Sequence, residues 1–231
     1  FRILKKIYDI GRGGNCMYLI TNGKVITRDI DTPYFEDGGV AVDGNKIIEV
    51  GSDLDLKLKY PHAEIIDAEG NLIMPAFINT HTHIYSALAR GLSINGYNPR
   101  NFYEVLNGMW WNIDRHLDLD GTRASAYATY IECIKNGVTT VFDHHASYGY
   151  IPGSLFEIAE VAKETGVRSC LCYEVSERDG AEKTAQAIQE NADFARYAKA
   201  AGSDMIQAMF GGHALFTISD KTFEAMLRAN G

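Results

Sequence analysis

The sequence predicts an α/β fold in which a small β-sandwich-like domain, residues 17–72, precedes about four β/α units, residues 73–231. Two observations support this prediction. Short runs rich in β-branched residues, separated by glycine-containing turns, fill the first region. Beyond residue 72, apolar strand-like runs alternate strictly with helical segments, and this alternation is typical of a parallel sheet covered by helices.

The β-domain is expected to contain short strands joined by tight turns. The predicted strands are residues 18–22, 24–28, 39–42 and 46–50. Residues 22–23, 37–39 and 43–45 read Asn-Gly, Asp-Gly-Gly and Asp-Gly-Asn, which are turn or hairpin signals because glycine and asparagine tolerate positive φ. Residues 67–70 predict a further turn before the second region.

The β/α units are delimited by helix-start and helix-stop signals. The predicted strands are residues 77–83, 139–145, 167–175 and 204–210, and the predicted helices are residues 101–116, 121–136, 154–166, 182–201 and 220–230. Asn101 with Glu104, and Ser154 with Glu157, have the three-residue spacing of a capping box. No GxGxxG motif opens the first crossover, so a dinucleotide-binding sheet loses its main support. An open sheet and a closed barrel are both compatible with the alternation.

Composition and charge limit the classes of partner. The chain has 30 acidic and 22 basic residues and a net charge of −8, which argues against nucleic acid because that binding relies on Lys and Arg. No apolar run reaches the length of about 18 residues that a membrane span needs. The four cysteines form no CxxC pair, which favours a reducing, cytoplasmic location. The first methionine is Met17, so we interpret residues 1–16 as a non-native leader.

The strongest chemical signal is the pair His81 and His83 at the end of the first strand of the second region. Side chains at positions i and i+2 of a strand share a face, so the two imidazoles can hold one metal ion, most commonly Zn²⁺. In a barrel this strand end lies at the mouth where active sites are built. The motif is weak alone, since chance gives about 0.2 such pairs in a chain of this composition, and two ordinary strand histidines are the alternative.

The context of the two histidines resembles a known family. Residues 73–83, IMPAFINTHTH, and residues 88–91, LARG, are similar to the opening of the barrel in the amidohydrolase superfamily, in its cytosine-deaminase-like and chlorohydrolase branch. Residues 22–27, 67–71, 110–115 and 137–143 extend the resemblance, which covers residues 17–231. The narrower similarity is to the aminohydrolases associated with selenium metabolism (SsnA type). Ala76 stands where the family commonly has glycine.

This resemblance implies a fold and a chemistry. It implies a (β/α)8 TIM-barrel hydrolase, here truncated to its N-terminal half, that acts on carbon–nitrogen bonds other than peptide bonds. The implied reaction is deamination of a heterocycle or an amidine, a small-molecule substrate, by a metal-activated hydroxide. The catalytic residues of relatives come from later strands, beyond Gly231, so none is assigned here and the fragment alone is expected to be inactive. The alternative is a non-catalytic half-barrel that serves as a binding or assembly module, with homo-oligomers in either case expected to cover the open edges.

By the same resemblance, His81 and His83 are the first two ligands of one divalent metal ion, with Zn²⁺ expected first and Fe²⁺ also suited to imidazole ligands. Binuclear relatives carry a carboxylated lysine at the end of strand four. Residues 204–216 contain no lysine, which favours a single ion.

Two further histidines are candidates for binding substrate. His213 lies in residues 211–216, GGHALF, where relatives have a similar turn whose histidine touches substrate. Both prolines of that turn are missing here, and a loop-structuring histidine is the alternative. In Asp143-His144-His145, the first and third residues share a face and His144 points oppositely. One of these histidines can reach the mouth of a barrel, and His145 is the candidate; a structural role is its alternative.

Other residues are assigned packing roles before functional ones. Trp110 and Trp111 are adjacent on a predicted helix, so we expect one in the core and the other at the rim. Arg90 is a candidate for binding an anionic substrate, although a surface or packing role is the simpler interpretation.

Overall fold

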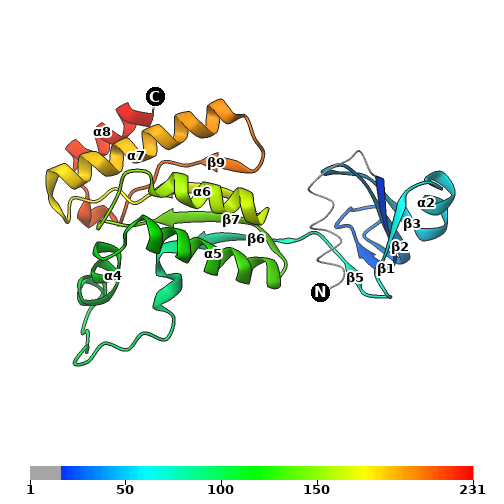
Figure 1. Ribbon diagram of the computed structural model, residues 1–231, viewed down its shortest axis with the longest axis horizontal. Coiled ribbons are helices and arrows are strands. Elements are labelled where there is room, and N and C mark those ends of the chain that lie inside the picture. The colour runs from blue at the N-terminus through cyan, green and yellow to red at the C-terminus, as the bar shows by residue number, and fades with distance from the viewer. Residues whose placement is uncertain (1–16, 231) are drawn as a thin grey trace. The chain divides into compact units, whose positions relative to one another are not determined.

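A computed structural model describes residues 17–230 of the chain (Figure 1). The chain divides into two compact units between Pro75 and Ala76, three residues beyond the boundary expected from the sequence. The interpretation of residues 1–16 as a leader lies outside the described residues. No helix within residues 17–230 combines the length and apolar character that crossing a membrane requires.

The described part of the first unit is one five-stranded sheet with a short helix. The elements are β1 (Met17–Ile26), β2 (Tyr34–Asp43), β3 (Lys46–Ser52), α2 (Asp53–Lys59), β4 (Glu64–Asp67) and β5 (Leu72–Ile73). The sheet order is β3-β2-β1-β4, and β5 also pairs with β1. Leu56 of α2 packs against Leu19 and Ala41 of the sheet. Within residues 17–75, a helix therefore covers the sheet where a second, sandwiched sheet was expected.

Two of the predicted turns lie inside strands. Asn22 has a φ of 53°, but β1 continues through it, and the β1–β2 register shifts on either side of Gly23. Gly38 lies within β2, and a Cβ there would meet Val25 Cγ2 at 2.6 Å, so the glycine permits close approach of two strands. The turn at residues 43–45 is confirmed, since it joins β2 to β3 with Gly44 at a φ of 57°.

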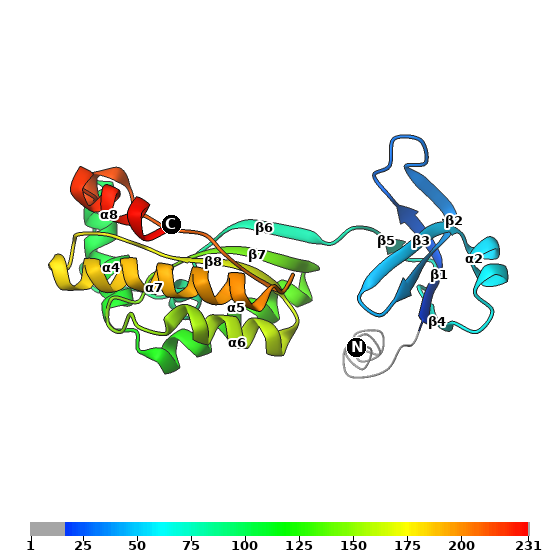
Figure 2. The same cartoon turned by 90° about the horizontal axis from the view of Figure 1, so that it is seen from above.

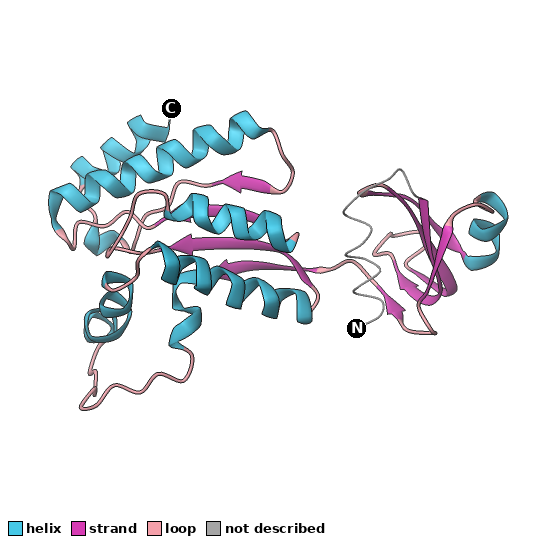
Figure 3. Ribbon diagram, viewed as in Figure 1, coloured by secondary structure: helices cyan, strands magenta, loops and turns pink. Residues whose placement is uncertain are grey.

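The second unit contains a parallel four-stranded sheet in the order β6-β7-β8-β9. The strands are β6 (Phe77–Thr82), β7 (Val138–His145), β8 (Arg168–Tyr173) and β9 (Ile206–Ala208). The helices are α3 (Phe102–Val105), α4 (Trp111–Arg115), α5 (Leu119–Lys135), α6 (Ser154–Thr165), α7 (Gly180–Ala201) and α8 (Asp220–Asn230). A π-helical turn, Leu106–Trp110, joins α3 to α4, and 3₁₀ segments cover Ile84–Ala89 and Leu215–Thr217. The alternation of strands and helices predicted from the sequence is confirmed (Figure 3).

One face of the sheet carries the core of this unit. Helices α5, α6 and α7 lie along that face (Figure 2). Side chains such as Tyr130, Val141, Ile158, Leu171 and Phe194 are fully buried there. Within the described residues, β6 and β9 are edge strands, and Phe77 and Ile78 of β6 are more than half exposed.

The start of α6 differs from the predicted capping box. Gly153, with a φ of 84°, is the N-cap residue, and the hydroxyl of Ser154 is buried without a partner. The Glu190 carboxylate of α7 instead accepts hydrogen bonds from the backbone N–H groups of Gly153 (2.8 Å) and Leu155 (2.9 Å). A carboxylate from a distant helix thus satisfies the free amides that a local side chain was expected to cap. The predicted cap at Asn101 is confirmed by a 2.9 Å bond from the Glu104 N–H to Asn101 Oδ1, while the Glu104 carboxylate accepts from the N–H of Arg100 at 2.7 Å.

Candidate metal and substrate site

His81 and His83 converge at the end of β6. Their Nε2 atoms lie 3.2 Å apart. The Nδ1 of His83 lies 3.0 Å from the carbonyl oxygen of His144, and because a carbonyl only accepts, Nδ1 carries the proton. This tautomer places the imidazole lone pair of His83 on Nε2, the atom that faces His81. This arrangement is the one by which proteins orient a metal-binding imidazole.

A cavity of about 860 Å³ opens beside the two histidines. Its polar lining includes His81, His83, His144, Glu174 and His213, which come from the ends of β6, β7 and β8 and from the loop after β9. Aromatic and apolar groups complete the wall, namely Phe102, Leu106, Trp110, Phe142, Met209 and Phe210. Apolar walls with a few converging polar groups are typical of small-molecule sites.

The structure corrects the placement of His145. His145 is fully buried, and its ring lies against the rings of Tyr85 and Tyr173, at centroid distances of 6.4 and 5.7 Å. Neither ring nitrogen has a hydrogen-bond partner among residues 17–230, and burial lowers the pKa of His145 to about 3. Alternation along β7 turns His145 toward the helices and His144 toward the cavity. The sequence showed that the two histidines point oppositely, but it did not show which side the helices cover.

His144 replaces His145 as the cavity histidine of β7. Its Nε2 lies 3.3 Å from the carbonyl oxygen of Gly212, so Nε2 carries the proton of the neutral ring. Its Nδ1 is buried without a hydrogen-bond partner and lies 3.8 Å from Oε2 of Glu174. Burial, followed by the neighbouring His83, lowers the pKa of His144 to about 4.

The loop after β9 places His213 on the cavity wall. The backbone N–H of His213 donates to the carbonyl of Val175 at 2.9 Å, which fixes the loop without the prolines found in relatives. A Cβ on Gly211 would meet the carbonyl oxygen of Tyr173 at 2.6 Å, so only glycine fits this approach. Burial lowers the pKa of His213 to about 4. The structure therefore brings His213 into the same cavity as His81 and His83.

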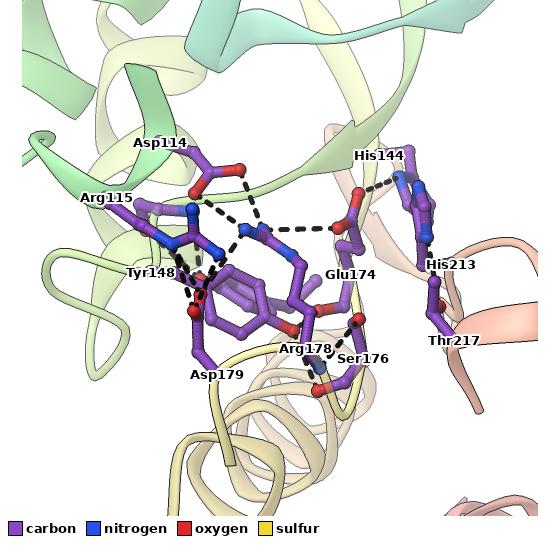
Figure 4. Close-up of polar contacts among 12 residues, drawn as sticks. Asp114, Arg115, His144, Tyr148, Glu174, Ser176, Arg178, Asp179, His213 and Thr217 are labelled. Carbon is purple, nitrogen blue, oxygen red and sulfur yellow. Dashed lines mark hydrogen bonds and ion pairs between the residues drawn. The ribbon is translucent and has the colours of Figure 1, made fainter. Parts of the chain in front are cut away.

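A buried charge network adjoins the cavity through Glu174, and no motif or spacing in the sequence predicts it (Figure 4). Arg178, whose side chain is 3% exposed, donates to both carboxylate oxygens of Asp114 at 3.1 and 2.7 Å. It also donates to Glu174 Oε1 at 3.3 Å and to Asp179 at 3.4 Å, and Asp179 in turn pairs with Arg115. Burial raises the pKa of Asp114 to about 6 and that of Glu174 to about 7, against the opposing effect of Arg178.

Asp143 supports the turn that follows the metal-site histidines. Its side chain is fully buried on the face of β7 that also carries His145, although the residue borders the cavity as well. Its Oδ1 accepts a 2.7 Å hydrogen bond from the N–H of Ile84. Its Oδ2 has no partner, and burial raises the pKa of Asp143 to about 8. The group is therefore a neutral carboxylic acid near pH 7, and its role is to hold the backbone next to His83.

Trp111 is buried, Trp110 lines the cavity, and Arg90 is exposed at the surface. Trp111 is 4% exposed, with the Arg178 guanidinium 5.1 Å from its ring, whereas Trp110 lines the cavity. One in the core and one at the rim was the expectation. Arg90 lines a neighbouring hollow of about 460 Å³ and is absent from the wall of the larger cavity.

Among the described residues, the side chains of His81 and His83 converge, and no third candidate metal ligand joins them. Within residues 17–230, no group of three or more His, Cys, Asp or Glu side chains gathers in a geometry that could hold a metal ion. A catalytic zinc site typically has three protein ligands and a water. Two histidines alone would therefore make up only part of such a site.

The chain is similar to enzymes of known name. Residues 72–230 match the amidohydrolase family. The 5'-deoxyadenosine deaminase of Methanobrevibacter smithii is 29% identical over 81% of this chain and 40% of its own length. The 5-methylthioadenosine/S-adenosylhomocysteine deaminase of Thermococcus sibiricus is 30% identical over 88% of this chain and 44% of its own length. The chain thus spans less than half the length of these relatives.

Solved structures share the fold. The guanine deaminase of C. acetobutylicum, solved with bound guanine, has a TM-score of 0.74 and 17% identity, over 92% of this chain and 50% of that one. The atrazine chlorohydrolase of Arthrobacter aurescens, solved with zinc and atraton, has a TM-score of 0.72 and 22% identity, over 91% and 50%.

Proposed function

This chain belongs to the amidohydrolase family, and from that premise we propose that it carries half of the active site of a metal-dependent hydrolase. The proposed reaction is hydrolysis of a carbon–nitrogen bond other than a peptide bond, with release of the amine from a heterocycle or an amidine. The observation that carries the proposal is the convergence of His81 and His83, with their Nε2 atoms 3.2 Å apart. The relatives named as deaminases of adenine nucleosides support the same reaction class.

The two histidines fit a divalent ion. Two nitrogens that each lie about 2.0–2.1 Å from one tetrahedral Zn²⁺ are roughly 3.3–3.4 Å apart, close to the observed separation. The hydrogen bond from His83 to the carbonyl of His144 leaves Nε2 unprotonated, as a ligand must be. When bound, such an ion lowers the pKa of a water from about 15.7 toward 7 and so supplies hydroxide at neutral pH. Imidazole ligands suit Zn²⁺ and Fe²⁺ alike.

Residues of this chain orient the proposed metal ligands and form one wall of the cavity. Asp143 holds the backbone of Ile84, which follows His83, and the His144 carbonyl sets the tautomer of that ligand. Trp110 and the other apolar groups of the wall exclude water from one side of the cavity. The remaining ligands and the proton-transfer groups are proposed to come from the part of a (β/α)8 barrel that would pair with β6 and β9, the exposed edges of the sheet.

The test is a reconstitution of activity in the full-length protein. 5'-Deoxyadenosine and guanine serve as assay substrates, and release of ammonia is measured for each. Chelation should abolish the release from whichever compound the protein deaminates, and one equivalent of Zn²⁺ or Fe²⁺ should restore it. A requirement for two metal equivalents per chain for full activity would contradict the proposal of a single metal ion. Stable metal-free protein that binds a small molecule and releases no ammonia from any aminated heterocycle or amidine would favour the non-catalytic module.

A further inference from the structure

Glu174 has one carboxylate oxygen, Oε2, that accepts no hydrogen bond from residues 17–230. Its side chain is 6% exposed and lines the cavity. Oε1 accepts from Arg178 at 3.3 Å, which holds the carboxylate in place, and Asp114 in turn holds Arg178 (Figure 4). Oε2 lies 3.8 Å from Nδ1 of His144. Because Glu174 lines the open cavity, an oxygen that takes no hydrogen bond from the described residues is free to accept one from a bound ligand.

His144 is not that partner. Its Nε2 faces the carbonyl oxygen of Gly212 and therefore carries the proton, so its Nδ1 has a lone pair. A lone pair facing a carboxylate oxygen makes no hydrogen bond. The 3.8 Å separation is also too long for one. The Oε2 of Glu174 thus remains an acceptor on the cavity wall.

His213 adds a second acceptor to the same wall. The Thr217 hydroxyl gives its single proton to the carbonyl of Ala214, at 2.9 Å, so its oxygen can only accept from Nδ1 of His213, at 3.0 Å. Nδ1 is then the protonated nitrogen, and Nε2 of His213 keeps its lone pair. The sequence had suggested a hydrogen bond between this imidazole and substrate, and the tautomer makes His213 the acceptor in it.

No cationic side chain balances these acceptors inside the cavity. Among the residues that line it, all within the described part of the chain, there is no Lys and no Arg. Behind it, the three carboxylates of Asp114, Glu174 and Asp179 face the two guanidiniums of Arg115 and Arg178. The wall therefore disfavours an anionic ligand group and favours a hydrogen-bond donor.

We propose that Glu174 is a specificity-determining residue that binds an amino or amidine N–H group of the substrate, with His213 as a second acceptor. The apolar and aromatic wall around it suits a planar ring that carries this group. The inference rests on the proposed function for its substrate class, but the binding preference it predicts needs neither metal nor turnover.

The test is a comparison of two probes of equal size. The metal-free, full-length protein is titrated with 2-aminopyrimidine and with 2-methylpyrimidine at pH 8 by isothermal titration calorimetry. The methyl group matches the amino group in volume but donates nothing. Because hydrogen bonds to a charged group are the stronger ones, the amino probe should bind at least about tenfold more tightly.

Variants assign that preference to Glu174. In Glu174→Gln, Arg178 takes the remaining carbonyl oxygen and turns the amide N–H₂ toward the cavity, so the preference should disappear. Glu174→Asp keeps the charge and serves if the Gln variant does not fold, and it should weaken the preference. The control is Asp179→Asn, since Asp179 pairs with the same Arg178 but does not line the cavity, and its preference should be unchanged.

Three results would overturn the inference: equal binding of both probes to the unaltered protein, a preference that survives Glu174→Gln, or a preference lost equally in Asp179→Asn. Each can occur in a protein that deaminates a heterocycle, so failure here is distinct from failure of the proposed function. A preserved preference in a protein without deaminase activity would uphold the binding role alone.

Discussion

The two faces of the sheet at the ends of β7 and β8 carry similar residue types with different consequences. On the helix face, Asp143 and His145 are fully buried, and burial moves both pKa values so that each group is neutral near pH 7. On the cavity face, His144 and Glu174 line an open space of about 860 Å³, where their side chains can meet a ligand. The side of the strand on which a residue lies therefore separates a packing residue from a candidate for binding better than its residue type does.

The largest expected effect comes from the metal-site pair itself. In the full-length protein, His83→Ala should remove the bound metal and lower kcat/KM by about three orders of magnitude or more, because a metal site that loses a ligand loses its activated water. Metal content by mass spectrometry and ammonia release measure this. The control is His116→Ala, an exposed histidine that bonds only to the carbonyl of Asn112. Full metal content in the His83 variant would contradict the proposal that His83 is a metal ligand.

On the helix face, Asp143→Asn should change how stability depends on pH. The folded-state pKa of about 8 lies above the unfolded value of about 3.9, so ionisation opposes folding and wild-type stability falls as pH rises from 4 toward 8. Asparagine cannot ionise and removes this fall. Between pH 5 and pH 8, the difference in unfolding free energy between the two proteins should change by roughly 4 kcal/mol, measured by urea unfolding. Parallel curves for the two proteins would show that Asp143 is ionised in the fold.

Gly211→Ala tests how the cavity face depends on the loop that carries His213. The added Cβ would lie 2.6 Å from the Tyr173 carbonyl oxygen and 2.8 Å from Cys172 Sγ, so the backbone must shift. We expect a loss of about 1–3 kcal/mol in stability and a higher KM. Thermal unfolding measures the loss of stability, and steady-state kinetics measure the change in KM. An unchanged KM despite the displaced loop would indicate that His213 does not bind substrate.

The smallest effect is expected for His145, the residue that the structure removed from the site. His145→Leu replaces two unpaired buried nitrogens with an apolar group, so stability should stay within about 1 kcal/mol of wild type or rise. Metal content and kcat should not change. A loss of activity with full metal content would return His145 to the site and weaken the contrast between the two faces.

The sequence predicted the second unit better than the first. Helix and strand alternation, the cap at Asn101 and the convergence of His81 with His83 follow from local periodicity and spacing, and the structure has all three. The turn predicted at residues 22–23 failed because a β-bulge and a hairpin turn require the same positive φ.

The rest of the site depends on contacts between distant residues. The pairing of Arg178 with Asp114 spans 64 positions, and no spacing rule connects them. The choice between His144 and His145 needed the side on which α5, α6 and α7 pack, which a single strand does not reveal. The cap of α6 by Glu190 has the same origin, since a tertiary contact displaced the local one.

The most direct test of the metal site is anomalous diffraction from crystals of the active, full-length protein, recorded on both sides of the absorption edge of its metal. We expect one peak about 2.0–2.1 Å from Nε2 of His81 and from Nε2 of His83, at the end of β6. A peak at another position, or an active protein with no anomalous peak beside these two nitrogens, would contradict the account.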